Sequence, residues 1–163
     1  FERGGHQWFS LQDMSAEARL AGTQTTAPVL DAFIDQKLAE TGFGEGKLAL
    51  IGFSQGTMLA LYVGLRRAKR LAGIIGYSGM LIGPELLADA IQSQPPVLLV
   101  HGDADALVDF NNSELMQSAL MSAGVETGLV VIEGAGHGFR TPEHRTQAMD
   151  ALVAWFKEHL TER

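Results

Sequence analysis

The chain of 163 residues contains no cysteine, which excludes thiol catalysis, disulfide bonds and thiolate metal sites. It also lacks any run of about 18 apolar residues, so we expect no stable membrane insertion. The basic cluster at residues 66–70 is short and lies at the end of an expected helix, where positively charged side chains interact favourably with the helix dipole. Because the net charge is −7, nucleic acid is not an expected partner.

Strand and helix patterns alternate along the chain, with short connections that contain glycine. Strands are expected at residues 47–53, 71–77, 97–100 and 129–132. A first helix is expected to end at Gly42, and a second covers residues 55–69. A third begins at Pro84, a fourth runs from a cap at Asn112 or Ser113 to Gly124, and a fifth begins at Pro142. This order predicts one α/β domain over residues 1–163, with a mostly parallel sheet and helices on both faces.

Three of the expected helices carry apolar stripes that predict their buried sides. These stripes comprise Val29, Leu30, Phe33, Ile34 and Leu38 in the first helix, Leu115, Met116, Ala119 and Leu120 in the fourth, and Met149, Leu152, Trp155, Phe156 and Leu160 in the last.

A serine stands between a strand pattern and a helical pattern in the pentapeptide Gly-Phe-Ser-Gln-Gly, residues 52–56. This arrangement is typical of the nucleophile elbow of serine hydrolases, and we expect both glycines to relieve crowding in the turn. Ser54 is the candidate nucleophile. The backbone N–H of Gln55, in the first turn of the helix, is the candidate oxyanion donor. Considered alone, Ser54 could equally be a helix cap.

Two later strands also run into polar residues at their carboxyl ends, where catalytic groups gather in parallel sheets. The second of these loops contains His137 between glycines, which makes it the candidate base ahead of His6, His101, His144 and His159. We expect His101 to pack or hydrogen-bond beneath the first loop, and His144 and His159 to lie on the surface of the last helix. On the residues alone, Asp103, Asp105 and Asp109 all remain candidates for the acid.

The same acidic loop superficially matches a calcium-binding loop. Leu107 would occupy a ligand position, however, and Val108 stands where a glycine must make the sharp turn. We therefore expect no metal and no other cofactor.

The ordered motifs Gly-Phe-Ser-Gln-Gly, His-Gly-x-x-Asp-x-x-Val and Gly-x-Gly-His resemble the phospholipase/carboxylesterase family of α/β-hydrolases, which includes the acyl-protein thioesterases. The resemblance implies Ser54 as nucleophile, Asp105 as acid and His137 as base. It also implies an acyl-enzyme, and small ester, thioester or lysophospholipid substrates. Ala106 and Asp109 stand where the family often has proline, which puts the shape of this loop in question.

Candidate acyl-pocket residues near the elbow are Met58, Met80, Leu81 and Phe139. We expect a cytoplasmic protein.

The N-terminal third of the sequence departs from a complete α/β-hydrolase. One helix and an irregular segment at residues 1–15 precede residue 47, where this fold needs further strands and a second oxyanion loop. We expect a C-terminal portion of a longer protein, with residues 48–53 as a sheet edge that favours association, including homodimers. The alternative function is a weak or silent binding module with this fold.

Overall fold

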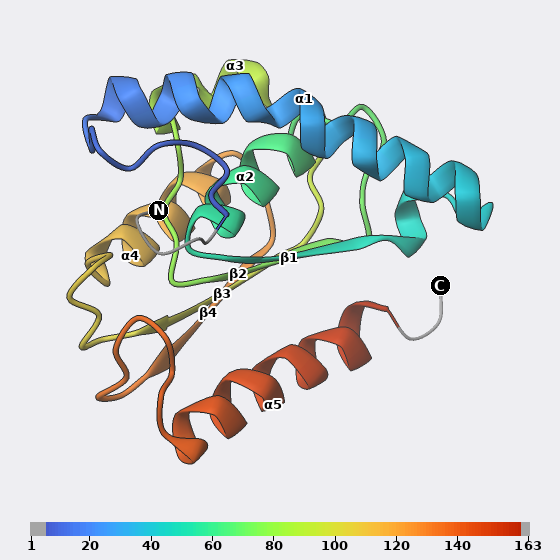
Figure 1. Ribbon diagram of the computed structural model, residues 1–163. Coiled ribbons are helices and arrows are strands. Elements are labelled where there is room, and N and C mark those ends of the chain that lie inside the picture. The colour runs from blue at the N-terminus through green and yellow to red at the C-terminus, as the bar shows by residue number, and fades with distance from the viewer. Residues whose placement is uncertain (1–5, 161–163) are drawn as a thin grey trace.

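The computed structural model describes residues 6–160, which contain a sheet of four parallel strands in the order β1-β2-β3-β4 (Figure 1). The strands are β1 (Ala49–Phe53), β2 (Gly73–Tyr77), β3 (Val97–Gly102) and β4 (Thr127–Ile132). Because the strands are parallel and in sequential order, the segments that follow them emerge at one edge of the sheet. The predicted fold class is confirmed.

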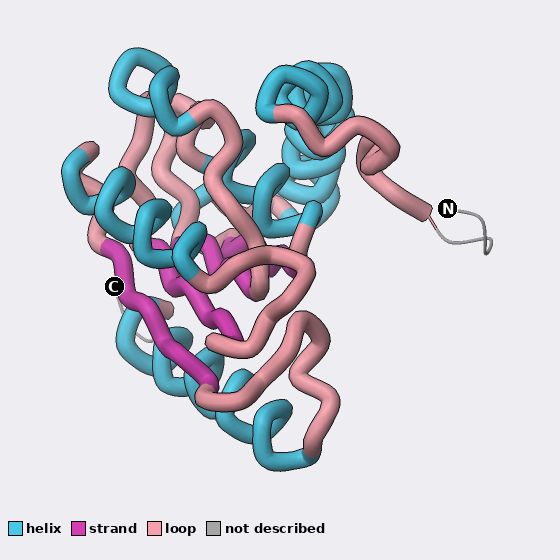
Figure 2. The backbone as a smooth tube through the Cα atoms, turned by 90° about the vertical axis from the view of Figure 1, so that its left-hand side faces the viewer, coloured by secondary structure: helices cyan, strands magenta, loops and turns pink. Residues whose placement is uncertain are grey.

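Helices cover both faces of this sheet. They are α1 (Ala16–Thr41), α2 (Gln55–Gly64), α3 (Leu87–Ala90), α4 (Asn111–Ser122) and α5 (Pro142–His159), with short 3-10 turns at Glu45–Lys47 and Pro84–Leu86. Figure 2 shows the strands between helices above and below. Helices α2 and α4 pack on one face, with α1 outside α2, and α5 packs on the other. None of the helices within residues 6–160 is both long and apolar enough to cross a membrane.

The core divides into two layers because neighbouring residues of a strand point to opposite faces. Ile74 of β2 packs toward α2 and α4, whereas its neighbour Ile75 packs toward α5. On the α5 side, Trp155 fills the space over Gly73, where an added Cβ would lie 1.8 Å from the tryptophan ring. The glycine therefore allows α5 to approach the sheet closely.

Some helix ends agree with local signals in the sequence, and others do not. Thr141 caps α5 by accepting from the N–H of His144 at 3.2 Å, and Gly124 follows α4 with a φ of 79°. The expected cap of α4 is wrong, because the helix starts at Asn111 and the Ser113 hydroxyl lies 2.6 Å from Nδ1 of His101 instead. Helix α2 ends at Gly64, five residues earlier than residue 69, the expected end.

Four residues of the predicted buried stripes are more than half exposed, so those predictions are wrong. They are Val29, Phe33, Leu115 and Met149. The reason is that each helix buries a narrower stripe: Ile34 anchors α1 on α2, Met116 and Leu120 anchor α4, and Trp155 anchors α5.

Strand β1 forms one edge of the sheet in the part of the chain described, as predicted. Ile51 and Phe53 are 55% and 48% exposed there. Association through this edge stays a prediction.

Candidate active site

Ser54 occupies the sharp turn between β1 and α2. Its φ of 52° and ψ of −113° are unusual for a residue with a side chain, and such backbone strain costs about 1–3 kcal/mol. The Ser54 N–H donates to the carbonyl of Tyr77 at 2.8 Å, and its own carbonyl accepts from Thr57 at 3.0 Å and Met58 at 3.2 Å. The adjacent strand and the first turn of α2 thus hold the serine in place.

The two glycines beside Ser54 differ in their roles. A Cβ on Gly52 would lie 2.4 Å from backbone atoms of Gly56 and Thr57, so only glycine fits without displacing the backbone. A Cβ on Gly56 would meet nothing within 4 Å. The expected crowding therefore holds for Gly52 and is wrong for Gly56, because a side chain on Gly56 would point into open space at the pocket that this residue lines.

The carboxylate of Asp105 is buried and receives hydrogen bonds on both oxygens. Oδ1 accepts from the N–H groups of Leu107 at 2.9 Å and Val108 at 3.0 Å, and Oδ2 lies 2.8 Å from Nδ1 of His137. Burial raises the pKa of Asp105, but the bonds from Val108, His137 and Leu107 outweigh it and hold the pKa below its usual value. The group is therefore an ionised acceptor facing His137.

The other two candidate acids face backbone groups. Oδ1 of Asp103 accepts from the N–H of Gly134 at 2.6 Å, which ties the loop after β3 to the loop after β4. Oδ1 of Asp109 accepts from the N–H of Asn111 at 2.8 Å, at the start of α4. Of the three aspartates, Asp105 is the one brought against His137.

His137 is presented by the loop after β4, with its side chain 19% exposed. Its ring lies beside that of Phe53, with centroids 4.9 Å apart, and its carbonyl accepts from the hydroxyl of Ser78 at 3.2 Å. Sequence reasoning missed Ser78, a buried residue with a φ of 46° that follows β2. The available signal was its position, since it is another polar residue at the carboxyl end of a strand.

His101 lies beneath the acid loop, where it was expected, and is completely buried. Its Nε2 lies 3.1 Å from Oδ2 of Asp105 and 2.9 Å from the carbonyl of Val108. Because both partners are acceptors, we assign the proton to Nε2. The remaining histidines do not contact Asp105: His144 lies at the start of α5, and His159 stacks on Trp155 at 4.5 Å, only partly exposed. His6 lines the pocket described next.

Ser54 and His137 line one pocket of ≈ 820 Å³ at the carboxyl edge of the sheet. Apolar side chains dominate its wall. They are Trp8, Leu11, Met14, Phe53, Met58, Leu107 and Val108, with His6, Gln7, Gln55 and Gly56 completing it.

Of the four residues expected in the pocket, Met58 is there and the other three lie elsewhere. Met80 packs with Phe9 and Ile82. Leu81 packs against the part of the core that α2 and α4 form with the sheet. Phe139 is buried on the α5 side of the sheet, edge-on to Tyr77. These three side chains pack into the core instead of facing the pocket, although His137, two residues before Phe139, lines it.

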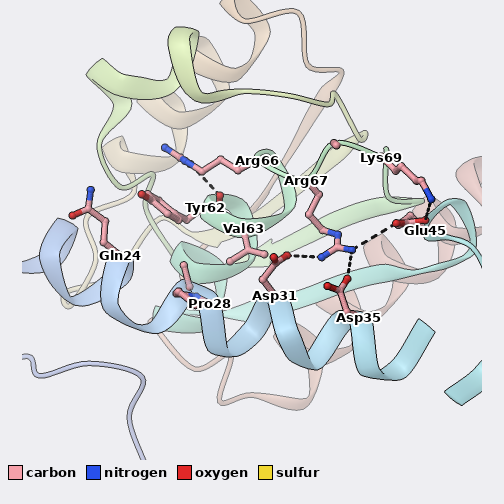
Figure 3. A pocket seen from close by; sticks show the side chains of 12 residues that line it. Gln24, Pro28, Asp31, Asp35, Glu45, Tyr62, Val63, Arg66, Arg67 and Lys69 are labelled. Atoms are coloured by element: carbon pink, nitrogen blue, oxygen red, sulfur yellow. Dashed lines mark hydrogen bonds and ion pairs between the residues drawn. The ribbon is translucent and has the colours of Figure 1, made fainter. Parts of the chain in front are cut away.

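A second cavity of ≈ 540 Å³ lies between α1 and the end of α2 (Figure 3). Arg67 reaches across it to Asp31 and to Asp35, which is 2.6 Å away, with Glu45 at 3.6 Å. Through Arg67, the basic cluster thus connects the segment that follows α2 to α1 by ion pairs. Within residues 6–160, no group of three or more side chains is placed to hold a metal ion.

Comparison with known proteins gives the family of this chain. The model of the Phospholipase/Carboxylesterase family matches residues 1–155. The chain belongs to this family. The crystal structure of esterase PE8 is similar to it, with 41% identity and a TM-score of 0.87, over 95% of this chain and 71% of that one. The resemblance and the α/β-hydrolase fold inferred from the sequence are confirmed.

Curated family relatives are longer than this chain. Esterase YpfH of Escherichia coli is 29% identical over 133 residues, which are 82% of this chain and 56% of YpfH. Acyl-protein thioesterase 1 of Schizosaccharomyces pombe is 37% identical over 103 residues, which are 61% of this chain and 45% of that protein. The chain thus spans about half the length of these two family members.

Proposed function

We propose that this protein is a serine hydrolase that cleaves carboxylic esters or thioesters through Ser54, His137 and Asp105. The observation that carries the proposal is the 2.8 Å contact between Asp105 and Nδ1 of His137, made at the rim of a pocket that Ser54 also lines. Relatives named esterase and acyl-protein thioesterase support the same reaction class.

Each residue has a defined step in this reaction. Asp105 holds His137 through Nδ1, so that Nε2 takes the proton of Ser54 as the serine oxygen attacks the acyl carbonyl. The backbone N–H of Gln55 stabilises the oxyanion. The alcohol or thiol then leaves with a proton from His137, and water activated by His137 hydrolyses the acyl-enzyme.

The apolar wall of the pocket favours the acyl chain as the part of the substrate that it binds. Trp8, Leu11 and Met14 present apolar surface, and removing this surface from water with an acyl chain is favourable. No cofactor has a role in this mechanism.

Hydrolysis of p-nitrophenyl butyrate by the purified protein tests the proposal. Ser54→Ala should lower kcat by about 10⁴ or more, because the nucleophile is lost. Ser122→Ala, an exposed serine at the end of α4, should stay within about twofold of the parent. A Ser54→Ala variant within tenfold of the parent contradicts the assignment. A folded parent that hydrolyses no ester points to the binding module instead.

A further inference from the structure

The side-chain amide of Gln55 fastens a distant segment of the chain to the elbow. Its Oε1 accepts from the N–H of Trp8 at 3.2 Å, and its Nε2 donates to the carbonyl of Phe9 at 2.8 Å. The acceptor and a donor of one amide are therefore both used by two consecutive backbone positions, which fixes the side chain in one orientation. The contact spans 46 and 47 residues of sequence.

The two aromatic rings beside this contact have different environments. Phe9 is buried against Met58 and Ile82, and α1 makes room for it with Gly22, where a Cβ would lie 2.7 Å from that of Phe9. Trp8 is 42% exposed and lines the same pocket as Ser54. Phe9 thus anchors the segment in the core, and Trp8 is left as pocket wall.

We infer that Gln55 is a positioning residue whose side chain holds Trp8 as a wall of the acyl pocket, and that it thereby sets the preference for long over short acyl groups. This inference rests on the proposed function. An acetyl group ends one methyl beyond the reacting carbonyl, whereas an octanoyl group has six further carbons to lay along the wall. Each methylene removed from water gains about fourfold in binding, so the wall matters more as the chain grows.

The ratio of kcat/KM for p-nitrophenyl octanoate to that for the acetate measures this preference. The ratio distinguishes a change in the pocket wall from a loss of the Gln55 backbone N–H as oxyanion donor, because the latter would lower kcat/KM for both esters. Gln55→Met keeps the length of the side chain and removes the amide. We expect the ratio to fall about tenfold, mainly through a higher KM for octanoate.

Two further variants sharpen the test. Trp8→Ala should lower the ratio to a similar extent, and adding Gln55→Met to Trp8→Ala should lower it no further, because both changes remove one wall. Gln12→Met, the same substitution at an exposed glutamine of this segment, should leave the ratio within about twofold of the parent.

Hydrogen exchange gives a readout that is independent of activity. In Gln55→Met the amides of residues 7–10 should exchange faster, while those of β3 keep their protection. An unchanged exchange rate at residues 7–10, a ratio within twofold of the parent, or equal losses on both esters would overturn the inference. A parent that hydrolyses neither ester contradicts the proposed function, and the exchange measurement then still decides whether Gln55 holds the segment.

Discussion

Nε2 of His101 lies 3.1 Å from Oδ2 of Asp105, the same oxygen that faces His137. With Leu107 and Val108 on Oδ1, the carboxylate accepts from four N–H groups. A completely buried histidine of β3 therefore helps to orient the proposed acid.

His101→Phe tests that relationship, because phenylalanine keeps a ring and loses both nitrogens. We expect kcat on p-nitrophenyl butyrate to fall about 10- to 100-fold as Asp105 loses a fixed position. The melting temperature should also fall, since the carbonyl of Val108 and the hydroxyl of Ser113 lose their partner. Ser113→Ala, which spares the contact with Asp105, should lower kcat less. An unchanged kcat in folded His101→Phe would contradict the role.

The three neighbouring aspartates should differ sharply when each is changed to asparagine. Asp105→Asn should lower kcat by about 10⁴, because it disrupts the tautomer and orientation of His137. Asp103→Asn and Asp109→Asn alter contacts to backbone N–H groups and should lower kcat less than about tenfold. Steady-state kinetics on one ester suffices; if Asp103→Asn were the damaging change, the assignment of the acid would be wrong.

Acid should weaken the stabilisation that Asp105 provides. Its pKa in the folded protein lies below the value of about 3.9 for an unfolded chain, so folding favours the ionised carboxylate. This contribution is present above the unfolded pKa and is lost as pH falls through the folded pKa. The gap in melting temperature between the parent and Asp105→Asn should therefore shrink from about pH 5 to pH 3. A difference in melting temperature that stays constant over this range would contradict a lowered pKa of Asp105 in the folded protein.

Gly52→Ala and Gly56→Ala form a matched pair at the elbow. The first forces a Cβ into the backbone of α2 and should prevent folding or lower the melting temperature by 10 °C or so. The second places its Cβ in open space, and alanine favours a helix, so its melting temperature should change little. Circular dichroism measures the melting temperature of each variant. Equal changes in melting temperature would contradict the conclusion that the backbone crowds Gly52 and leaves space at Gly56.

Much of this arrangement was predictable because strand ends are local features of sequence. Apolar runs located β1, β2, β3 and β4, and parallel order placed the polar residues after them at one edge. The choice among the aspartates was not predictable from spacing, since Asp103 and Asp105 share a loop. It depends on which carboxylate turns toward His137, and the geometry favours Asp105.

The features that could not be predicted from the sequence depend on contacts between segments that are distant along the chain. Periodicity shows that Phe33 and Ile34 lie near one helix face, but not that α1 buries Ile34 against α2 and leaves Phe33 exposed. Likewise, nothing in the irregular N-terminal segment indicates that Trp8 lies in the pocket, because Gln55 holds it there from 47 residues away.

Labelling with a fluorophosphonate probe, followed by mass spectrometry of the digested protein, tests the central claim most directly. Such a probe reacts covalently with a serine activated by a neighbouring base. We predict one labelled peptide, modified at Ser54, in the folded parent and no label at this site in Ser54→Ala. A folded parent that takes up no probe, or takes it up at another residue, would contradict the account.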